Sequence, residues 1–250
     1  MLADDYPDGV EVVLVAPRNP LNIGAAARAM ANFGFLRLTV VAPFEPLWRE
    51  ARSAVGAPEL LRTANECATL AEALAGCTLV VGTGTRTHRK PEQPVVSLPD
   101  LEPRVAGELA CGGRVALVFG PEKRGLTRED FSRCHLLAEI PTGARQPSMN
   151  LGQAVAVCLY ELTRSGTESA RDPTPAGLQS PAMSGTLDRL AEVIEETMTA
   201  SGYSPQAMEA ANRHDLRVLL RRLSWAETDA KRALGVFRRI LWCLRRPGAG

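Results

Sequence analysis

The residues best suited to chemistry fall in three short segments far apart in the chain. In order, they are Asn22, Gly24 and Arg28; Gly120, Glu122 and Gly125; and Ser148, Met149 and Asn150. The segments offer glycines, amides, a hydroxyl and a carboxylate, but no cysteine or serine with a matching histidine and acid, and no set of metal ligands. Such groups suit a site that holds a preformed reactive cofactor, which the protein orients and shields from water.

The first segment predicts a helix. Asn22 is a suitable N-cap, residues 25–33 are rich in alanine, and Gly34 is a suitable stop. Gly24 and Arg28 would then lie one turn apart on one face. We expect the glycine to leave room for a ligand and the arginine to reach over that gap.

Five apolar runs predict buried strands, and helical patterns separate them. The strands are expected at residues 10–16, 36–42, 78–81, 114–119 and 136–140; the helices at 68–75, 101–110, from Thr127 with Asp130, and from Asn150. This alternation predicts a mostly parallel α/β sheet covered on both faces. The loops at 82–85, 120–125 and 141–150 all leave carboxyl ends of strands, where open α/β sheets bind ligands.

Two common nucleotide sites are disfavoured. Thr87 stands where a dinucleotide fingerprint starting at Gly82 would need its third glycine, and no carboxylate ends the 36–42 strand. Leu126 follows Gly125, where a P-loop would place lysine. A nicotinamide enzyme and an ATPase are therefore poor interpretations of the sequence.

Composition sets broader limits. The chain has 250 residues, 45% of them hydrophobic, and a formal net charge of +1. No apolar run reaches the roughly 18 residues that span a bilayer, and the acidic start does not look like a signal peptide. We expect a cytoplasmic protein without membrane contact. The six cysteines never form a C-x-x-C pair, so neither a disulfide framework nor a zinc site is indicated.

The end of the chain differs in character. Residues 165–185 are rich in Ser, Gly, Pro and Thr, which is typical of a flexible linker, and helices are expected at 187–200, 207–223 and 227–246. From Asn212 onward, ten basic residues stand against the three acidic residues Asp215, Glu227 and Asp229: Arg213, Arg217, Arg221, Arg222, Lys231, Arg232, Arg238, Arg239, Arg245 and Arg246. This pattern indicates either a solvated or dimer-facing surface or an RNA-binding one. We expect Trp48, Trp225 and Trp242 to be packing residues, although Trp225 could stack on a base.

Together the three segments resemble the three motifs of the SPOUT-class RNA 2′-O-methyltransferases. The matching patterns are Asn22-x-Gly24-x-x-x-Arg28, Phe119-Gly120-x-Glu122-x-x-Gly125-Leu126, and Ile140-Pro141 followed by Ser148-Met149-Asn150-Leu151. Their order and spacing agree over roughly residues 10–163. Within the class, the run from Asn150 to Val155 with a linker and helical extension is most similar to the tRNA methyltransferases of ribose thirty-two in the anticodon loop.

The resemblance implies a fold, a cofactor and a partner. The fold would be an α/β domain at 1–164 with a C-terminal deep trefoil knot, then a flexible linker at 165–185 and a small, basic helical extension at 186–250. S-adenosylmethionine would be the methyl donor, and tRNA the substrate. The protein would be a homodimer, with Arg28 of one subunit near the cofactor of the other.

The resemblance also implies roles for individual residues. The catalytic group would be Arg28, Asn22, Glu122, Ser148 and Asn150. The cofactor would be held by Thr83, Gly84, Thr85, Gly120, Ile140, Ser148, Met149, Asn150 and Leu151. We expect RNA contacts from Arg18, Arg86, Arg89, Lys90, Arg145, Arg238, Arg239, Arg245 and Arg246, and no metal. Arginine is essentially always protonated, so we expect Arg28 to stabilise developing alkoxide charge rather than act as a base.

Alternatives remain at this stage. An rRNA 2′-O-methyltransferase, including the antibiotic-resistance kind, fits the same motifs, as does a non-catalytic RNA-binding protein that keeps the fold. Residues 144–147 lack an aromatic residue that the tRNA subfamily would lead us to expect, and Met149 replaces a leucine. Without its motif, Arg28 would be interpreted as a solvated helix arginine.

Overall fold

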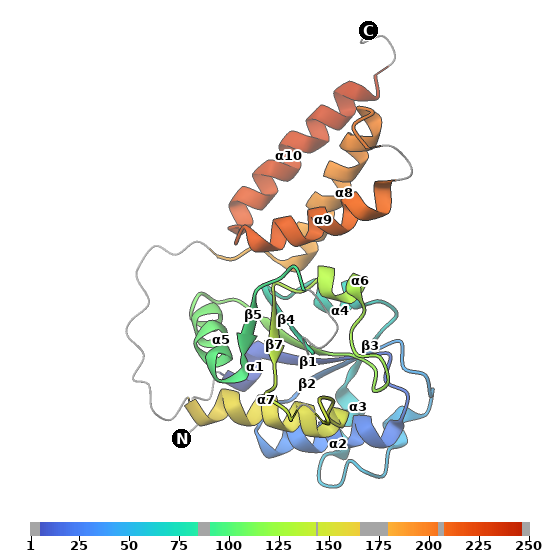
Figure 1. The fold of residues 1–250 in the computed structure, drawn as a ribbon, viewed down its shortest axis with the longest axis vertical. Helices are drawn as coiled ribbons and strands as arrows, with labels where there is room; N and C mark the ends of the chain where they lie inside the picture. Colours follow the sequence, from blue (N-terminus) through green and yellow to red (C-terminus); the bar gives the residue numbers. More distant parts are fainter. Residues whose placement is uncertain (1–5, 85–90, 144, 166–179, 205–207, 247–250) are drawn as a thin grey trace.

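A seven-stranded sheet forms the centre of the protein (Figure 1). The computed structural model describes residues 6–84, 91–143, 145–165, 180–204 and 208–246. The strands are β1 (Val10–Val15), β2 (Arg37–Val41), β3 (Asn65–Cys67), β4 (Leu79–Thr83), β5 (Val95–Ser97), β6 (Val115–Phe119) and β7 (Leu136–Glu139). Their order across the sheet is β3-β2-β1-β6-β4-β7-β5. Every strand pair among the described residues is parallel, which confirms the prediction of a mostly parallel α/β sheet.

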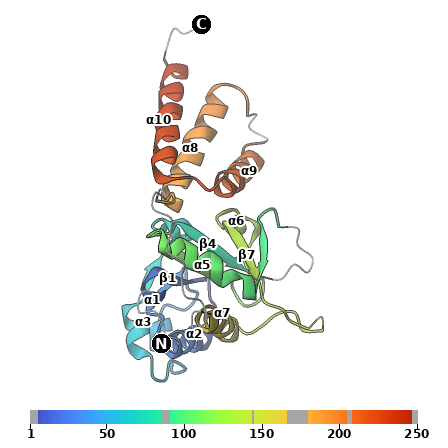
Figure 2. The same ribbon diagram turned by 90° about the vertical axis from the view of Figure 1, so that its left-hand side faces the viewer.

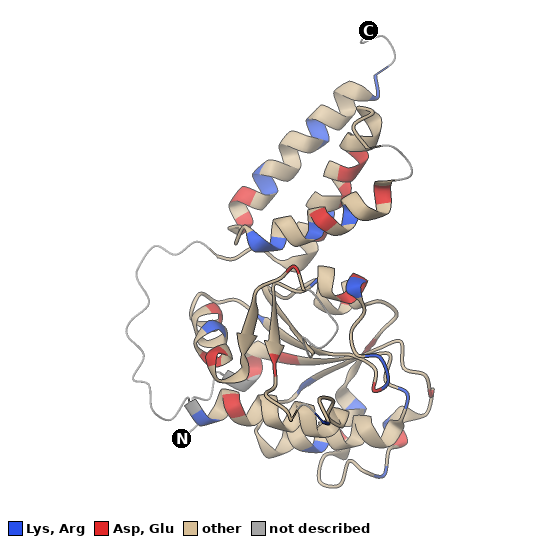
Figure 3. Cartoon of the chain, in the orientation of Figure 1, with Lys and Arg blue, Asp and Glu red and all other residues tan. Residues whose placement is uncertain are grey.

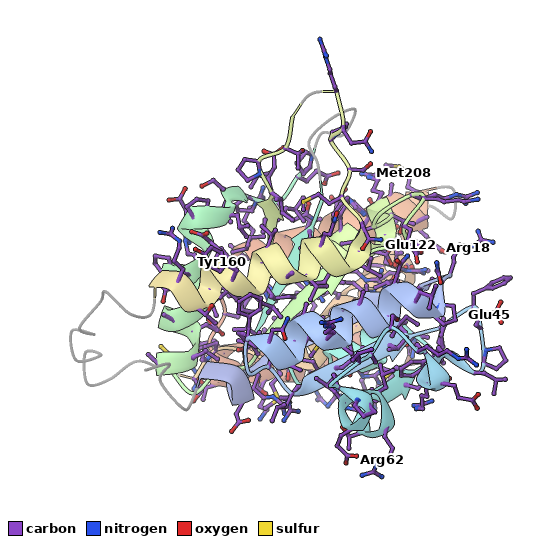
Figure 4. The ribbon with its side chains drawn as sticks, turned by 90° about the horizontal axis from the view of Figure 1, so that it is seen from below. Arg18, Glu45, Arg62, Glu122, Tyr160 and Met208 are labelled. Atoms are coloured by element: carbon purple, nitrogen blue, oxygen red, sulfur yellow. The ribbon has the colours of Figure 1, made fainter. Side chains whose placement is uncertain are left out.

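Helices bury both faces of the sheet. One face carries α2 (Pro20–Asn32), α3 (Pro58–Thr63), α5 (Leu101–Ala110) and α7 (Leu151–Ser165); the other carries the short α4 (Leu70–Leu74) and α6 (Arg128–Ser132). Alternation along β1 fits this arrangement, because Val12 and Leu14 enter the first core and Val13 and Val15 the second. The helices α2 and α7 lie side by side (Figure 4).

Several short elements were absent from the sequence prediction. They are β3, β5, α1 (Tyr6–Gly9), α3 and the 3₁₀ turns η1 (Trp48–Glu50) and η2 (Leu98–Asp100). The two missed strands are three residues long and stand at the two edges of the sheet, where their side chains are half-buried or exposed. A run this short cannot display an apolar period, so only tertiary pairing identifies it.

The predicted start of the first long helix was wrong. Asn19 is the N-cap of α2, since its side chain accepts from the backbone N–H of Leu21 at 2.9 Å, and Pro20 takes the first helical position. Asn22 lies inside the helix, which frees its side chain for other contacts. Gly24 does not open space for a ligand either, because a Cβ there would lie 2.2 Å from Ser53 Oγ and 2.9 Å from Ala54 N.

Three further helices form a unit of their own at the end of the chain. They are α8 (Ser184–Ala200), α9 (Glu209–Arg222) and α10 (Glu227–Leu244). The helix α8 starts inside the range predicted as linker, and just before it the backbone N–H of Ala182 donates to Trp225 O at 2.9 Å. Figure 2 shows this unit stacked on one end of the α/β domain.

The helical unit docks at the amino ends of β4 and β7. Ser184 N donates to Cys77 O at 2.8 Å, just before β4. Asp188 of α8 forms ion pairs with Arg133, which lies just before β7, and with Arg221 of α9. The N–O distances are 2.8 and 2.7 Å, respectively. The Arg221 side chain is only 1% exposed, and its Nε also donates to Arg133 O at 2.9 Å.

These contacts correct the expectation of an open basic face on α9. Arg213, Arg217 and Arg221 do share one side of the helix, but each pairs with an acid of the same chain: Glu195, Glu129 and Asp188, respectively. Their charges are used for packing within the molecule. Figure 3 shows blue and red segments together on and around α9, whereas α10 has red segments at its start and blue ones farther along.

Within the described residues, none of the helices is long and apolar enough to cross a bilayer.

Asp188 makes the attachment of the helical unit testable. Asp188→Asn should lower the free energy of unfolding by about 3 kcal/mol, because it leaves the buried Arg221 guanidinium without its counter-charge. Urea unfolding followed by circular dichroism measures this difference. The control is Arg189→Gln, which breaks an exposed pair with Glu192 on the same helix and should leave the midpoint nearly unchanged. Equal effects of the two substitutions would contradict the account.

Candidate functional site

Three loops at the carboxyl edge of the sheet enclose a cavity of about 270 Å³. The loops follow β4, β6 and β7, three strands that are neighbours in the sheet. The cavity is close in size to the smallest sites for organic ligands, roughly 300 Å³. Strand ends therefore bring together segments that lie up to about 70 residues apart in the chain, as the parallel topology requires.

Most of the residues that the sequence suggested for cofactor binding line this one cavity. Seven do so: Thr83, Gly84, Gly120, Ile140, Ser148, Met149 and Leu151. Asn150 does not line it but caps the helix α7 beside it, and Thr85 lies outside the described residues. The segments around β4, β6 and β7 thus converge as the loop positions predicted.

The wall has apolar and polar parts. Phe119, Met149 and Ala154 give apolar surface, while Glu122 and Lys123 add opposite charges. Such a wall fits a ligand with a flat apolar part and a charged part, as S-adenosylmethionine has. Sequence reasoning gave no cofactor role to eight further lining residues: Phe119, Pro121, Lys123, Arg124, Gly125, Thr142, Pro147 and Ala154. The adjacent basic pair inside the glycine loop was the one signal that could have pointed to Lys123 and Arg124.

The loop after β6 depends on its glycines. A Cβ on Gly120 would lie 2.2 Å from Leu126 N and 2.3 Å from Gly125 C, so only glycine permits this closeness. Gly125 has a φ of 61°, in the left-handed region. The loop therefore folds tightly back on itself, and this fold carries Glu122 toward the start of α2.

Glu122 gathers donors from the segment before and inside α2. Its carboxylate accepts from the backbone N–H groups of Arg18 and Asn19, each at 3.2 Å, and from Asn22 Nδ2 at 2.8 Å. Asn22 Oδ1 in turn accepts from Asn150 Nδ2 at 2.9 Å. Figure 4 shows Glu122 beside Arg18 at the ends of α2 and α7.

Chemistry fixes the direction of this chain of hydrogen bonds. An ionised carboxylate only accepts, so Asn22 must turn its NH₂ toward Glu122 and its oxygen toward Asn150. At the other end a backbone N–H only donates, and Asn150 Oδ1 accepts from Gly152 N at 2.9 Å. Both ends demand the same orientation of the two amides. Asn150 is thus the N-cap of α7, as the sequence predicted, and the network ties three segments together.

The network also sets the charge state of Glu122. Partial burial by itself would raise the pKa of this carboxyl, but the hydrogen bonds from Asn22 and from backbone N–H groups outweigh it. The pKa of Glu122 is therefore lowered, and the group is an anion at neutral pH. Its acceptor-only character is what the orientation of both amides requires.

Arg28 and Ser148 take different positions. Ser148 is exposed and lines the cavity, so its hydroxyl is open to a ligand or substrate. Arg28 is exposed on α2 and is not among the residues that line the cavity of its own chain. The structure thus places Asn22, Glu122 and Asn150 in one network, Ser148 beside it, and Arg28 apart.

The arginines suggested for RNA contact fall into two separate groups. Arg18 is exposed beside Glu122, and its guanidinium lies 5.0 Å from the centre of the Phe44 ring; Arg145 is exposed in the loop that supplies Thr142 and Pro147 to the cavity. Four others lie on or just after α10, beyond the opposite edge of the sheet: Arg238, Arg239, Arg245 and Arg246. Arg86, Arg89 and Lys90 lie outside the described residues.

One group of side chains has the composition of a metal site. Ligand atoms of Glu92, His214 and Asp215 lie within 4.8 Å of one another, between α9 and the loop before β5. However, Glu92 also pairs with the exposed guanidinium of Arg128 at 2.8 Å, so its negative charge already has a partner within the protein. We interpret the group as part of the packing between the helical unit and the sheet.

Comparisons with known proteins give concordant results. Residues 9–160 match the SpoU rRNA methylase family. The chain is similar to the tRNA (cytidine/uridine/adenosine-2′-O-)-methyltransferase TrmJ of Pseudomonas aeruginosa strain UCBPP-PA14, with 34% identity over 248 residues, covering 94% of this chain and 93% of the relative.

Two solved structures extend the comparison. The crystal structure of TrmJ from Z. mobilis ZM4 aligns with a TM-score of 0.79 and 30% identity, covering 92% of this chain and 98% of that one. The SpoU methyltransferase AviRb from Streptomyces viridochromogenes, solved in complex with the cofactor AdoMet, aligns with a TM-score of 0.51 and 21% identity, covering 67% of this chain and 62% of that one. The second likeness shows the fold.

The charge of Glu122 can be tested through stability. Glu122→Gln should lower the free energy of unfolding by about 1 kcal/mol, a modest value because water screens this partly exposed group. The folded-state pKa is lowered, so the carboxylate stabilises the protein above its unfolded pKa of about 4.3, and this contribution is lost as pH falls through the folded pKa. The difference between the variant and the wild type should therefore vanish in acid.

Urea unfolding at neutral pH and below pH 4 measures this difference. The control is Glu45→Gln, an exposed glutamate in the segment after β2 that Figure 4 shows away from the network. A difference that stays constant with pH would mean that the charge of Glu122 is not what holds the network.

Proposed function

We propose, from the premise that this chain belongs to the SpoU rRNA methylase family, that it methylates the 2′-hydroxyl of a tRNA ribose with S-adenosylmethionine as donor. The cavity between the three glycine-containing loops is the observation that carries this proposal. The relative from Pseudomonas aeruginosa, which is named as a tRNA 2′-O-methyltransferase, and the solved TrmJ structure match this chain over almost its full length, helical extension included. The AdoMet complex of the more distant AviRb supports the choice of donor.

We propose the lining residues as the cofactor site. Backbone groups at Thr83, Gly84 and Gly120 and the side chains of Ile140 and Met149 would hold S-adenosylmethionine, and Leu151 would close the apolar wall. Once bound, the cofactor would supply an electrophilic methyl group. The lowered pKa of Glu122 keeps an anion near the cavity, where it can attract the cationic part of the donor.

The chain's own residues would position the nucleophile. A ribose hydroxyl is a weak nucleophile, so it must lie in line with the methyl group and lose its proton as the new bond forms. Ser148 lies open at the cavity and can orient the hydroxyl. Arg28 would stabilise the negative charge that develops on the ribose oxygen and hold the adjoining phosphate.

The position of Arg28 requires a second subunit for this role. It is exposed on α2 and does not line the cavity of its own chain. Leu21, two helical turns before Arg28 on the same side of α2, is 54% exposed, and Tyr160 on the neighbouring α7 is 51% exposed (Figure 4). Apolar side chains of this size on a flat pair of helices are typical of an interface. We therefore propose a homodimer through α2 and α7, in which Arg28 serves the partner's cavity.

The finer parts of the assignment are also proposals. The target would be ribose thirty-two of the anticodon loop, and a tRNA substrate would place the enzyme in the cytoplasm. The segment from β7 to α7 would form the trefoil knot, which is supported by the insertion of β7 between β4 and β5 and by the return of α7 to lie against α2. Arg18 and Arg145 would contact RNA beside the cavity, and α10 would contact it at the far side.

Substitution of Arg28 tests the catalytic proposal. Arg28→Ala should lower kcat for methyl transfer to tRNA by about 10²- to 10³-fold, as the loss of one transition-state donor does elsewhere. Binding of S-adenosylmethionine, measured by calorimetry, should change little. The control is Arg62→Ala on α3, an exposed arginine away from the proposed interface. Unchanged methylation by Arg28→Ala, or absence of cofactor binding by the wild type, would overturn the proposal.

Mapping of the methylated nucleotide tests the substrate. RNA from a strain lacking the gene should lack one methyl group on an anticodon-loop ribose of tRNA that is present in the same strain after complementation with the gene. Mass spectrometry of nuclease fragments detects the difference. A difference in rRNA instead would favour the ribosomal alternative. No difference in either RNA, together with intact RNA binding, would favour a non-catalytic RNA-binding protein.

A further inference from the structure

The helix α10 leaves the aromatic ring of Trp242 exposed. The inner side of the helix packs Ala230 and Leu241, which are 0% and 7% exposed. Trp242 is 41% exposed; Ile240 and Leu244 are also exposed, at 41% and 43%, but they lie on the opposite flank of the helix. Figures 1 and 2 agree that the other described helices and strands lie on one side of α10. The expectation that Trp242 is a packing residue was therefore wrong.

Two arginines hold the exposed indole between them. Arg239 stands three residues before Trp242, on the same side of α10, whereas Arg246 lies four residues after it, just beyond the end of the helix. Their guanidinium carbons lie 4.1 and 3.5 Å from the centre of the ring. Cation–π contacts of this kind place planar groups over the indole ring. A nucleobase could take the position of either guanidinium once that group turns away from the ring.

Some of the basic side chains on and just after α10 form ion pairs within the protein, and others do not. Lys231 pairs with Glu227, and Arg245 pairs with Glu196 of α8. For Arg238, Arg239 and Arg246, in contrast, the described residues hold no acidic partner. Three such cations, two of them against one exposed aromatic ring, favour a polyanion with planar groups over an apolar or acidic protein surface.

We propose that Trp242 is a base-stacking residue, on which an unpaired nucleobase of the bound RNA lies while Arg239 and Arg246 turn to the neighbouring phosphates. The inference rests on the proposed function in taking RNA as the partner, and it adds a residue and a mode of recognition. A duplex keeps its bases stacked on one another, so this surface would select single-stranded or looped RNA. Arg238 would add a further phosphate contact.

Stacking and charge can be separated by their salt dependence. Affinity is measured for a short oligouridine and for a duplex RNA over a range of salt concentrations. Trp242→Leu should weaken oligouridine binding by about 5- to 100-fold while leaving the salt slope unchanged. The double substitution Arg239→Gln and Arg246→Gln should instead flatten the slope by about 1.4, or about 0.7 for each phosphate that is no longer neutralised.

Fluorescence gives a signature that a structural role would not produce. Trp48 is buried and Trp225 half-buried, so oligouridine should quench mainly the emission of Trp242. Trp242→Phe keeps an aromatic ring and should keep most of the affinity while losing most of the quenching. Arg232→Gln is the matched control on the same helix, because that arginine lies near Asp229 and away from the ring. Thermal midpoints of all variants confirm that they fold.

Distinct results would overturn the inference. Unchanged oligouridine affinity in Trp242→Leu would remove the stacking role, as would an equal loss for oligouridine and duplex. A shift of Trp242→Leu to a smaller species in sedimentation, with RNA affinity unchanged, would assign the face to a second copy of the chain. Failure of the wild type to bind or methylate any RNA would instead contradict the proposed function, independently of Trp242.

Discussion

The hydrogen-bonded chain from Glu122 through Asn22 to Asn150 is the interaction on which the rest of the site depends. It joins the loop after β6, the helix α2 and the start of α7, three segments that are distant in the sequence. Because a carboxylate stands at one end and a backbone N–H at the other, the network has a single direction. It can form only when all three segments have reached their places, so it links folding of the loops to the shape of the cavity.

This constraint organises a molecule with two functional edges. The carboxyl edge of the sheet holds the cavity, with Arg18 and Arg145 close by. The amino edge is occupied by the helical unit, which Asp188 and its two arginines fasten in place. In the proposed function, methyl transfer would take place at one edge and additional RNA contacts would form at the other. The affinity for RNA and the rate of methyl transfer could then depend on different residues. In this proposal, Arg28 serves the chemistry and Trp242 the RNA contact; both side chains are exposed.

The main strands and helices could be predicted from the sequence because each has a strong local signal. Buried apolar runs located β1, β2, β4, β6 and β7, and the capping pair Thr127 and Asp130 located α6. The roles of side chains that depend on tertiary contacts could not be predicted in this way. Asn22 looked like a cap because asparagine often caps, yet Asn19 and Pro20 were better placed, and Asn22 serves a network whose other members lie 100 or more positions away. Likewise, Arg213, Arg217 and Arg221 form a basic stripe in sequence, but their acidic partners lie on other elements.

The central claim is that the network centred on Asn22 shapes the cofactor cavity. A double-mutant cycle between Glu122→Gln and Asn150→Ala, with the affinity for S-adenosylmethionine measured by calorimetry, tests it most directly. These two side chains share Asn22 as their common partner, so their effects should be coupled by about 1 kcal/mol. Strictly additive losses, or affinities equal to that of the wild type, would show that the cavity keeps its shape without the network and would contradict the account.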